Sequence, residues 1–239
     1  DIINKISAPR LKGLNRVAWN LRHSSATAIN PDRLPRGGGR RGWYNSGQLA
    51  SPGSYTATLV KESEGMSVDL DDPITFNVVD LDRGTLQGMS YTEYNDHAQN
   101  MIATQNRQSL FTDKLNENIN MIKAMRLSLS RSKSINNNLS NNLFNIEEEL
   151  SQLSKKIFGN SAKSEVGVKN DPTVSTYIGN AYRGITSTYG PTGQHKQSLS
   201  IANSMLDKLE VELNIIVGKI PSLKIELDNM NAPPIIGAN

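Results

Sequence analysis

The chain has 239 residues, a formal net charge of +3 and no cysteine. The lack of cysteine excludes a disulfide framework, a thiolate zinc site and a cysteine nucleophile. With 36% hydrophobic and 5% aromatic residues, the composition suits helices with one buried stripe better than a large compact enzyme core. No apolar run is long enough to predict a membrane-spanning helix, and nothing in the sequence implies a cofactor.

The charge changes sign within the first third of the chain. Residues 1–60 contain nine Lys or Arg and two acids, whereas residues 61–82 contain one Lys and seven acids. Opposite charges on neighbouring strands predict cross-strand ion pairs, and a basic surface that faces a partner is the alternative. The first five residues hold neither Met nor an apolar signal core, which predicts a processed or truncated start.

Residues 1–84 predict an antiparallel β-sandwich. Apolar and polar residues alternate over 16–22, 53–59, 66–70 and 74–78, and a further candidate strand covers 2–6. Four strands and one candidate are few for a closed sandwich, so we expect an incomplete one whose missing strand lies upstream. Trp19 is expected on the inward face, where its ring would bury a large area. Pro52 and Gly53 predict a type II turn into the second strand.

A long connection from 23 to 52 contains the candidate binding residues. Three glycines among arginines, followed by two aromatics, could cradle phosphate, stack on nucleic-acid bases or contact a glycan, although the run is not a phosphate-loop pattern. The alternative is an exposed connection that keeps the chain soluble. The candidate residues are Arg33, Arg36, Arg40, Arg41, Trp43 and Tyr44.

Three segments of residues 13–82 carry a family resemblance. The segment Gly13 to Arg22 looks like the "G-x-N-x-x-x-W-[DN]-L-R" strand of bacterial sortilin-like proteins, which are also described as BNR-repeat or glycosyl-hydrolase-like proteins. The segment Gly47 to Tyr55 resembles their "G-x-x-V-x-P-G-x-Y" motif. The segment Phe76 to Asp82 is similar to their strand ending in "V-x-x-D-P-R", but Leu81-Asp82 replaces Pro-Arg. The motif residues carried over are Asn15, Trp19, Leu21, Arg22, Pro52, Gly53 and Tyr55.

Residues 89–232 predict an antiparallel helical bundle with three long helices and one short one, followed by a tail over 233–239. A capping box at Ser90 and Glu93 begins the first helix, which is expected to end near Arg131. Apolar residues spaced by three and four predict a helix over 139–157, a shorter one with apolar residues at 174–185 and a last one, after Gly193, with apolar residues at 199–227. Asp171 is expected to cap the short helix, and Pro221 is expected to kink the last one.

No motif predicts catalysis. The three histidines match no zinc-helix pattern, and a triplet of acids at 147–149 lies on the polar side of a predicted helix. A glycosidase needs two carboxylates held on either side of a cleft, and no pair of acids here is placed in that way. Asp69, Asp71 and Asp72 with Asp80 or Asp82 could gather calcium, but the spacing fits no EF-hand. We therefore predict neither a catalytic nor a metal site.

The resemblance completes the functional expectation. It extends to Tyr189–Thr192 and Ile220–Leu223, and it implies an α+β, multidomain chain made of an immunoglobulin-like module and a helical region. Such a chain would be the noncatalytic C-terminal accessory module of a larger exported propeller protein. Its partners would be the upstream propeller and other cell-surface or secreted proteins. A carbohydrate-binding module of a surface glycoside hydrolase, or a nucleic-acid-binding module, are the alternatives.

Overall fold

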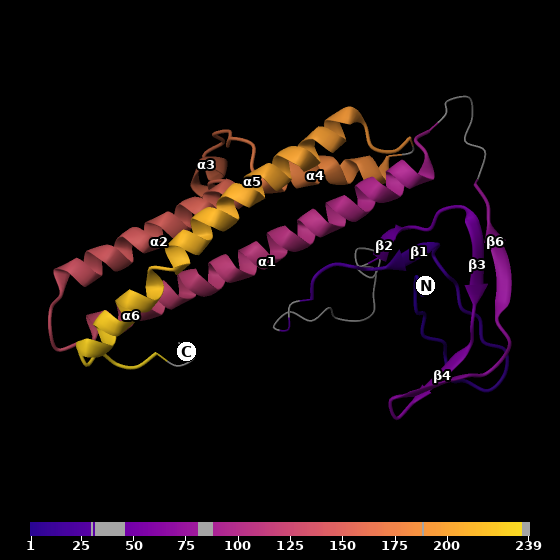
Figure 1. Cartoon of the computed structure of the whole chain (residues 1–239), viewed down its shortest axis with the longest axis horizontal. Coiled ribbons are helices and arrows are strands. Elements are labelled where there is room, and N and C mark those ends of the chain that lie inside the picture. The colour runs from indigo at the N-terminus through magenta and orange to yellow at the C-terminus, as the bar shows by residue number, and fades with distance from the viewer. Residues whose placement is uncertain (30, 32–45, 81–87, 188, 236–239) are drawn as a thin grey trace. The chain divides into compact units, whose positions relative to one another are not determined.

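The computed structural model describes residues 1–29, 31, 46–80, 88–187 and 189–235 (Figure 1). The chain is mixed α and β and is 55% helical. It divides into two compact units: unit 1 is Asp1–Ala26 with Pro35–Asn95, and unit 2 is Thr27–Leu34 with Asp96–Asn239. The predicted domain limit at residue 84 falls outside the described residues. No helix in the described ranges has the length and apolar character needed to cross a bilayer.

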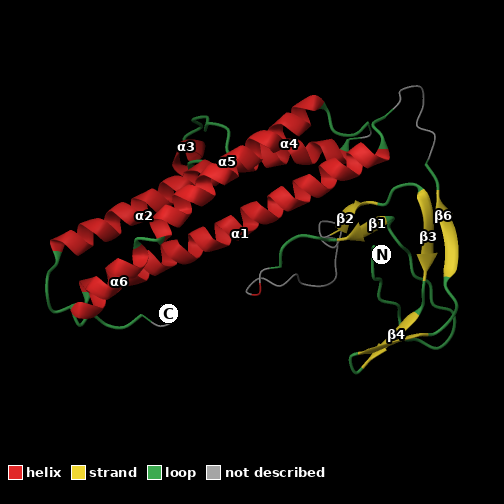
Figure 2. Ribbon diagram, in the orientation of Figure 1, coloured by secondary structure: helices red, strands yellow, loops and turns green. Residues whose placement is uncertain are grey.

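Unit 1 contains three two-stranded antiparallel sheets, drawn in yellow in Figure 2. The first pairs β1 (Arg22–Ser24) with β2 (Ser46–Leu49). The second pairs β3 (Gly53–Ala57) with β6 (Ile74–Val78). The third pairs β4 (Val60–Ser63) with β5 (Met66–Asp69). The strands predicted from alternation over 53–59, 66–70 and 74–78 correspond to β3, β5 and β6.

The strand predicted over 16–22 is wrong. Residues 16–20 form no strand, and β1 begins only at Arg22. Leu21 has a φ of 56°, which is left-handed backbone, and such a conformation interrupts an extended strand for a residue with a Cβ. The alternation of Val17, Trp19 and Leu21 therefore does not place three side chains on one buried face.

Two other predictions about the strands also differ from the structure. The candidate strand over 2–6 is absent from the described structure, although Ser24 N–H donates to the Ile3 carbonyl oxygen at 2.8 Å. Conversely, the expected long connection contains β2. A Cβ at Gly47 in β2 would lie 2.5 Å from the Ser24 carbonyl oxygen, so only glycine allows β1 and β2 to approach this closely.

The helices begin and end at the expected signals. Ser90 caps α1 (Tyr91–Ser130) as predicted, because Glu93 N–H donates to Ser90 Oγ at 3.3 Å; the Glu93 carboxylate meets the same hydroxyl, with Ser90 Oγ–H donating to Glu93 Oε2 at 3.1 Å. The Asn136 side chain caps α2 (Asn137–Phe158) by accepting from Leu139 N–H, and Gly159 ends it with a φ of 90°. A short helix that was not predicted, α3 (Ser161–Glu165), follows at once.

The last three helices differ in detail from the prediction. Thr173, rather than Asp171, caps α4 (Val174–Thr186), because its Oγ1 accepts from Thr176 N–H at 3.2 Å. The final predicted helix is divided into α5 (Gly193–Val217) and α6 (Ile220–Asn229). Pro221 lies in the first turn of α6, where its missing N–H removes no helical hydrogen bond. The predicted kink is thus a break between two helices.

The helices of unit 2 share one apolar core. Side chains from α1, α2, α4, α5 and α6 join one cluster of buried residues, and Figure 1 shows these helices gathered together. Arg126, near the end of α1, pairs with Glu147 in α2. Nearer the start of α1, Gln108 contacts Ser175 and His97 contacts Ala181, both in α4. The two contacts of α4 run in the opposite order along α1, so α4 lies antiparallel to this part of α1. The residues of the core that are less than 2% exposed and come from the long helices include Leu115, Ile122, Met125, Leu139, Leu143, Leu150, Ile157, Leu206 and Leu213.

Candidate interaction surface

Unit 1 lacks a buried apolar core in its described residues. Every buried hydrophobic side chain of the described chain lies between Ala98 and Leu227, which is within unit 2. In unit 1 the only described residues of the buried class are Gly47 and Gln48. Two-stranded sheets are marginally stable on their own because they need an apolar surface to pack against. The exposed apolar side chains of unit 1 are therefore the first candidates for contact with a partner.

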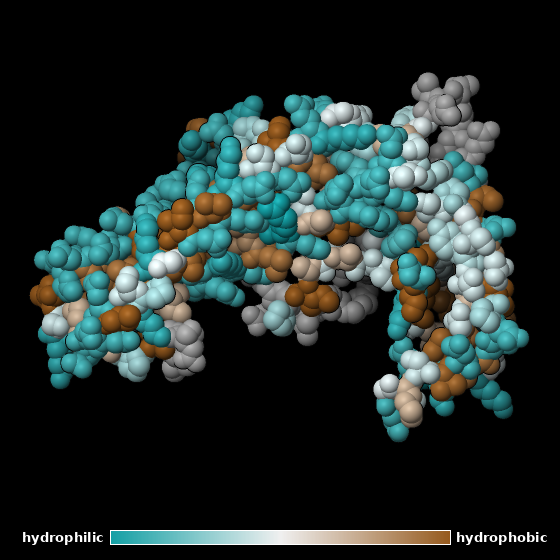
Figure 3. Space-filling view, in the orientation of Figure 1, coloured by the Kyte–Doolittle hydropathy of each residue, from teal (hydrophilic) through white to brown (hydrophobic). Residues whose placement is uncertain are grey.

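The β3–β6 sheet has one apolar face. Tyr55 lies opposite Phe76, and Ala57 lies opposite Ile74, so these four side chains point to the same side. Ile74 is 68% exposed and Phe76 is 37% exposed. Polar residues Ser54, Thr56, Thr75 and Asn77 occupy the other face. Figure 3 shows hydrophobic residues at the surface of the strands.

Trp19 covers part of this apolar face without being buried. Its ring centroid lies 5.4 Å from that of Tyr55 and 6.1 Å from that of Phe76. Its Nε1–H donates to the Arg22 carbonyl oxygen at 2.9 Å, which fixes the indole near the start of β1. The expectation that Trp19 fills an enclosed core is wrong, because its ring is only half-buried where it packs on the rings of Tyr55 and Phe76.

The remaining motif residues hold backbone rather than a ligand. Asn15 Nδ2–H donates to the carbonyl oxygens of Leu11 at 2.7 Å and Gly13 at 3.1 Å, which closes a local turn. Arg22 Nη1–H donates to the Gly47 carbonyl oxygen at 3.1 Å, between β1 and β2. The Leu21 carbonyl oxygen accepts from Ala50 N–H at 2.8 Å.

The residues before β3 are arranged differently from the expected type II turn. Gly53 is the first residue of β3, and its φ of 158° is extended backbone paired with Val78. Pro52 is half-buried just before it. The Tyr55 hydroxyl donates to the Ser51 carbonyl oxygen at 2.6 Å, so Tyr55 braces the chain where it enters the strand.

The β4–β5 hairpin is also amphipathic. Its register places Val68 opposite Lys61 and Met66 opposite Ser63, and a hydrogen bond from Leu70 N–H to the Leu59 carbonyl oxygen extends the ladder by one pair. Leu59, Met66, Val68 and Leu70 therefore share one face, and each is at least 55% exposed. Glu64 and Gly65 make the turn with φ values of 54° and 78°. A two-residue turn of this left-handed type favours a tight antiparallel hairpin.

Only part of the predicted charge pairing is found. Lys5 Nζ lies 3.2 Å from Glu62 Oε1, and this pair joins the basic start of the chain to the acidic hairpin. Both side chains are well over half exposed, so the pair contributes little to stability. The six residues proposed for glycan or nucleic-acid binding, Arg33, Arg36, Arg40, Arg41, Trp43 and Tyr44, lie outside the described residues.

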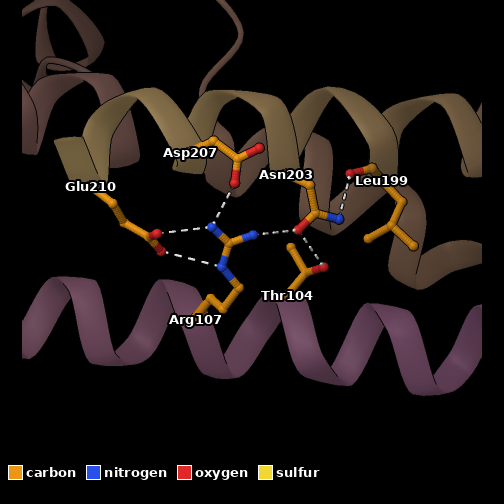
Figure 4. Close-up of polar contacts among 6 residues, drawn as sticks. All are labelled: Thr104, Arg107, Leu199, Asn203, Asp207 and Glu210. Carbon is orange, nitrogen blue, oxygen red and sulfur yellow. Dashed lines mark hydrogen bonds and ion pairs between the residues drawn. The ribbon is translucent and has the colours of Figure 1, made fainter. Parts of the chain in front are cut away.

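A polar network between α1 and α5 was not predicted (Figure 4). Arg107 Nε–H donates to Glu210 Oε1 at 3.2 Å, and Nη2–H donates to Glu210 Oε2 at 2.9 Å and Asp207 Oδ1 at 2.8 Å. Arg107 Nη1–H and Thr104 Oγ1–H both donate to Asn203 Oδ1. The hydrogen bonds to Glu210 and then to Asp207 raise the pKa of Arg107 above its ordinary value. The interruption of the apolar stripe near Gln105 and Gln108 was the one sequence signal for this network.

Two of the three histidines and two of the acids at 147–149 have partners within the protein. His97 is buried, and its Nε2 lies 3.1 Å from the Ala181 carbonyl oxygen. His195 Nδ1 accepts from Thr192 N–H at 3.1 Å at the start of α5. Glu147 and Glu149 form interhelical ion pairs with Arg126 and Lys219. Within the described ranges, no three His, Asp or Glu side chains lie close enough to hold a metal ion.

A comparison of the chain with family models, curated proteins and solved structures found no match.

Proposed function

We propose that this chain is a noncatalytic interaction module that docks onto a partner through unit 1. The observation that carries the proposal is the absence of any buried apolar side chain from the described part of unit 1. A group of strands with an apolar face and no second layer gains stability when another surface covers that face. Unit 2, whose helices already bury their apolar stripes on one another, would serve as a spacer or support.

The larger context of the proposal rests on the resemblance to sortilin-like proteins. In this context unit 1 is an incomplete immunoglobulin-like sandwich, and the chain is the C-terminal accessory module of an exported propeller protein. The partner that covers the β3–β6 face is the upstream propeller. Support comes from the exposed face itself, from Trp19 packed on Tyr55 and from the Tyr55 hydroxyl that braces Ser51, since these residues belong to the resembling motifs.

The helical region is proposed to be an antiparallel bundle. The pairs Lys156–Glu212 and Glu149–Lys219, the latter residue lying just after α5, run in opposite order along α2 and the chain of α5, which supports an antiparallel pair. The pairs Thr104–Asn203 and Lys114–Asn214 run in the same order along α1 and α5, which supports a parallel pair. Both relations hold if α1 and α5 run in one direction and α2, followed by α4, runs in the opposite direction beside them.

The carbohydrate-binding and nucleic-acid-binding alternatives depend on the segment 33–44. Glycan binding that is lost in Trp43→Ala would support the first alternative. Binding to a polyanion that weakens steeply with salt would support the second, because phosphate contacts release counterions. Neither result would be expected from a module that docks through the β3–β6 face.

The test compares two substitutions on β6. Ile74→Asp places a charge on the exposed apolar face, whereas Thr75→Asp places the same charge on the polar face of the same strand. Binding to the separately produced propeller, measured by calorimetry, should be lost in Ile74→Asp and kept in Thr75→Asp. Since Ile74 is 68% exposed, the substitution empties no core. Equal binding by both variants, the lack of blade-like repeats in the region encoded before Asp1, or hydrolysis of glycosides or peptides by this chain alone would refute the proposal.

A further inference from the structure

We infer that the chain associates with a second copy of itself, through the β4–β5 hairpin of one copy and residues 10–17 of the other. This inference uses residues other than the β3–β6 face and does not depend on the proposed docking to a propeller. It rests on two exposed surfaces of unit 1 that are complementary to each other in charge and that both carry exposed apolar side chains.

The first surface is the face of the hairpin that carries Leu59, Met66, Val68 and Leu70, with Lys61 and Ser63 opposite Val68 and Met66 on the same face. Acidic residues lie at both of its ends: Glu64 in the turn and Asp71 and Asp72 just after Leu70. Glu64 and Asp72 have no side-chain partner among the described residues. Glu62, on the opposite face of the hairpin, is the acid that Lys5 already contacts. The contact within one chain thus occupies the polar face and leaves the apolar face open.

The second surface is the segment 10–17. Its basic residues Arg10, Lys12 and Arg16 are exposed and have no ion pair or hydrogen bond from their side chains in the described structure. The apolar residues between them are also exposed, with Leu11 at 74%, Leu14 at 94% and Val17 at 44%. Asn15 holds this segment in a fixed turn through the Leu11 and Gly13 carbonyl oxygens, so it presents a defined surface.

The two surfaces match each other. The hairpin has apolar residues and Lys61 between acids at its two ends, with three acids against one base, and the other surface has apolar residues between bases. A hydrophobic contact with a rim of opposite charges gives both affinity and a defined register. Neither set of charges is paired within the part of the chain that the structure describes, so both are open to a second chain. The contact is reciprocal in a two-fold dimer, since each copy supplies one hairpin and one basic segment, so every favourable pair occurs twice.

The test reverses the charges on each surface. Arg10→Glu with Arg16→Glu makes the segment acidic, and Glu64→Lys with Asp72→Lys makes the hairpin basic. The unaltered chain, at 26.3 kDa, should sediment as a dimer at low salt and dissociate as salt rises. Each variant alone should be monomeric, with its dimerisation weakened about tenfold or more. An equimolar mixture of the two variants should form a heterodimer, because each reversed surface then meets its complement.

The control is Lys123→Glu with Lys133→Glu in unit 2, which changes the net charge as Arg10→Glu with Arg16→Glu does, at exposed residues that have no side-chain partner in the described chain. It should dimerise like the unaltered chain. A monomeric unaltered chain at low salt, a control variant that dissociates equally, or a mixture that stays monomeric would each overturn the inference. Recovery of the dimer in the mixture also excludes misfolding as the reason for dissociation of the single variants.

Discussion

Arg107 of α1 and Glu210 of α5 form a two-point ion pair, with Nε 3.2 Å from Oε1 and Nη2 2.9 Å from Oε2. A planar guanidinium that meets both oxygens of a carboxylate fixes distance and orientation together. The same guanidinium contacts Asp207 and Asn203, which lie on the same face of α5. Because many core residues on α1 and α5 are leucine or isoleucine side chains of similar size, this network is well suited to set the register of the two helices.

Arg107→Met should therefore lower the free energy of unfolding by about 1 kcal/mol. The value is modest because Glu210 and Asp207 are 39% and 66% exposed, so water solvates them once the cation is gone. Urea unfolding followed by circular dichroism measures the change. Arg131→Met is the control, since Arg131 is exposed just after α1 and has no side-chain partner among the described residues. Equal losses in the two variants would contradict a role for the network.

The network should keep its contribution when the pH is raised from neutral to about 10. Folding raises the pKa of Arg107, so its stabilisation is complete below the ordinary arginine pKa and is lost only above the raised one. The stability difference between the unaltered chain and Arg107→Met, measured at both pH values, should be the same. A difference that shrinks over this range would show that Arg107 is not the group that holds the two helices.

The helices were predictable because their signals are local. Apolar residues spaced by three and four, a capping box at Ser90 and a glycine after Phe158 all act within a few residues. The strand at 16–22 was predicted wrongly because alternation does not reveal a left-handed residue such as Leu21. The strand β2 was missed because Ser46–Leu49 has only one large apolar residue, and its position depends on a close approach between Gly47 and Ser24.

The candidate surface was less predictable than the fold. The sequence indicated the apolar faces at Tyr55, Phe76 and Ile74, but not whether a second layer covers them, because that depends on packing far along the chain. The Arg107 network joins residues about a hundred positions apart, and sequence spacing carries no information on such a contact. The sequence showed that the first residues are basic and the hairpin is acidic. It did not show that, among the described residues, only Lys5 and Glu62 pair between these two segments.

Two glycines in α4 should respond in opposite ways to replacement by alanine. A Cβ at Gly184 would lie 2.9 Å from Pro191 Cβ and 3.1 Å from His195 Cβ, whereas a Cβ at Gly179 would have no neighbour within 4 Å. Gly179→Ala should raise the free energy of unfolding by about 0.5 to 1 kcal/mol, since alanine loses less backbone entropy in a helix. Gly184→Ala should lower it by about 1 to 3 kcal/mol through overpacking. Thermal unfolding of both variants measures the contrast, and stabilisation by Gly184→Ala would contradict the close packing of α4 on the start of α5.

A hydrogen bond near the end of the chain offers a third stability test. Ser128 is buried, and its Oγ–H donates to the Pro233 carbonyl oxygen at 2.5 Å. Ser128→Ala leaves that acceptor without its donor and should lower the free energy of unfolding by about 1 kcal/mol. Ser130→Ala, at an exposed residue whose hydroxyl bonds only to the Leu127 carbonyl oxygen within α1, should change it by less than about half as much. Urea unfolding measures the contrast, and equal losses in the two variants would mean that the Ser128 hydrogen bond does not stabilise the chain.

The two units should unfold in separate steps, with unit 1 first. Unit 2 has a buried core of aliphatic side chains, whereas the described part of unit 1 has none, and buried apolar area is the main source of stability. In a Trp43→Phe background, Trp19 is the sole tryptophan, so its fluorescence follows unit 1 through contacts with Tyr55 and Phe76. Far-ultraviolet circular dichroism follows the helices. The fluorescence transition should occur at a lower temperature than the loss of helix, and Leu206→Ala in α5 should lower only the second midpoint. Coincident transitions that Leu206→Ala shifts together would mean that the chain unfolds as one cooperative body. Unit 1 would then be as stable as unit 2 without a partner on its exposed apolar face, which would contradict the proposal.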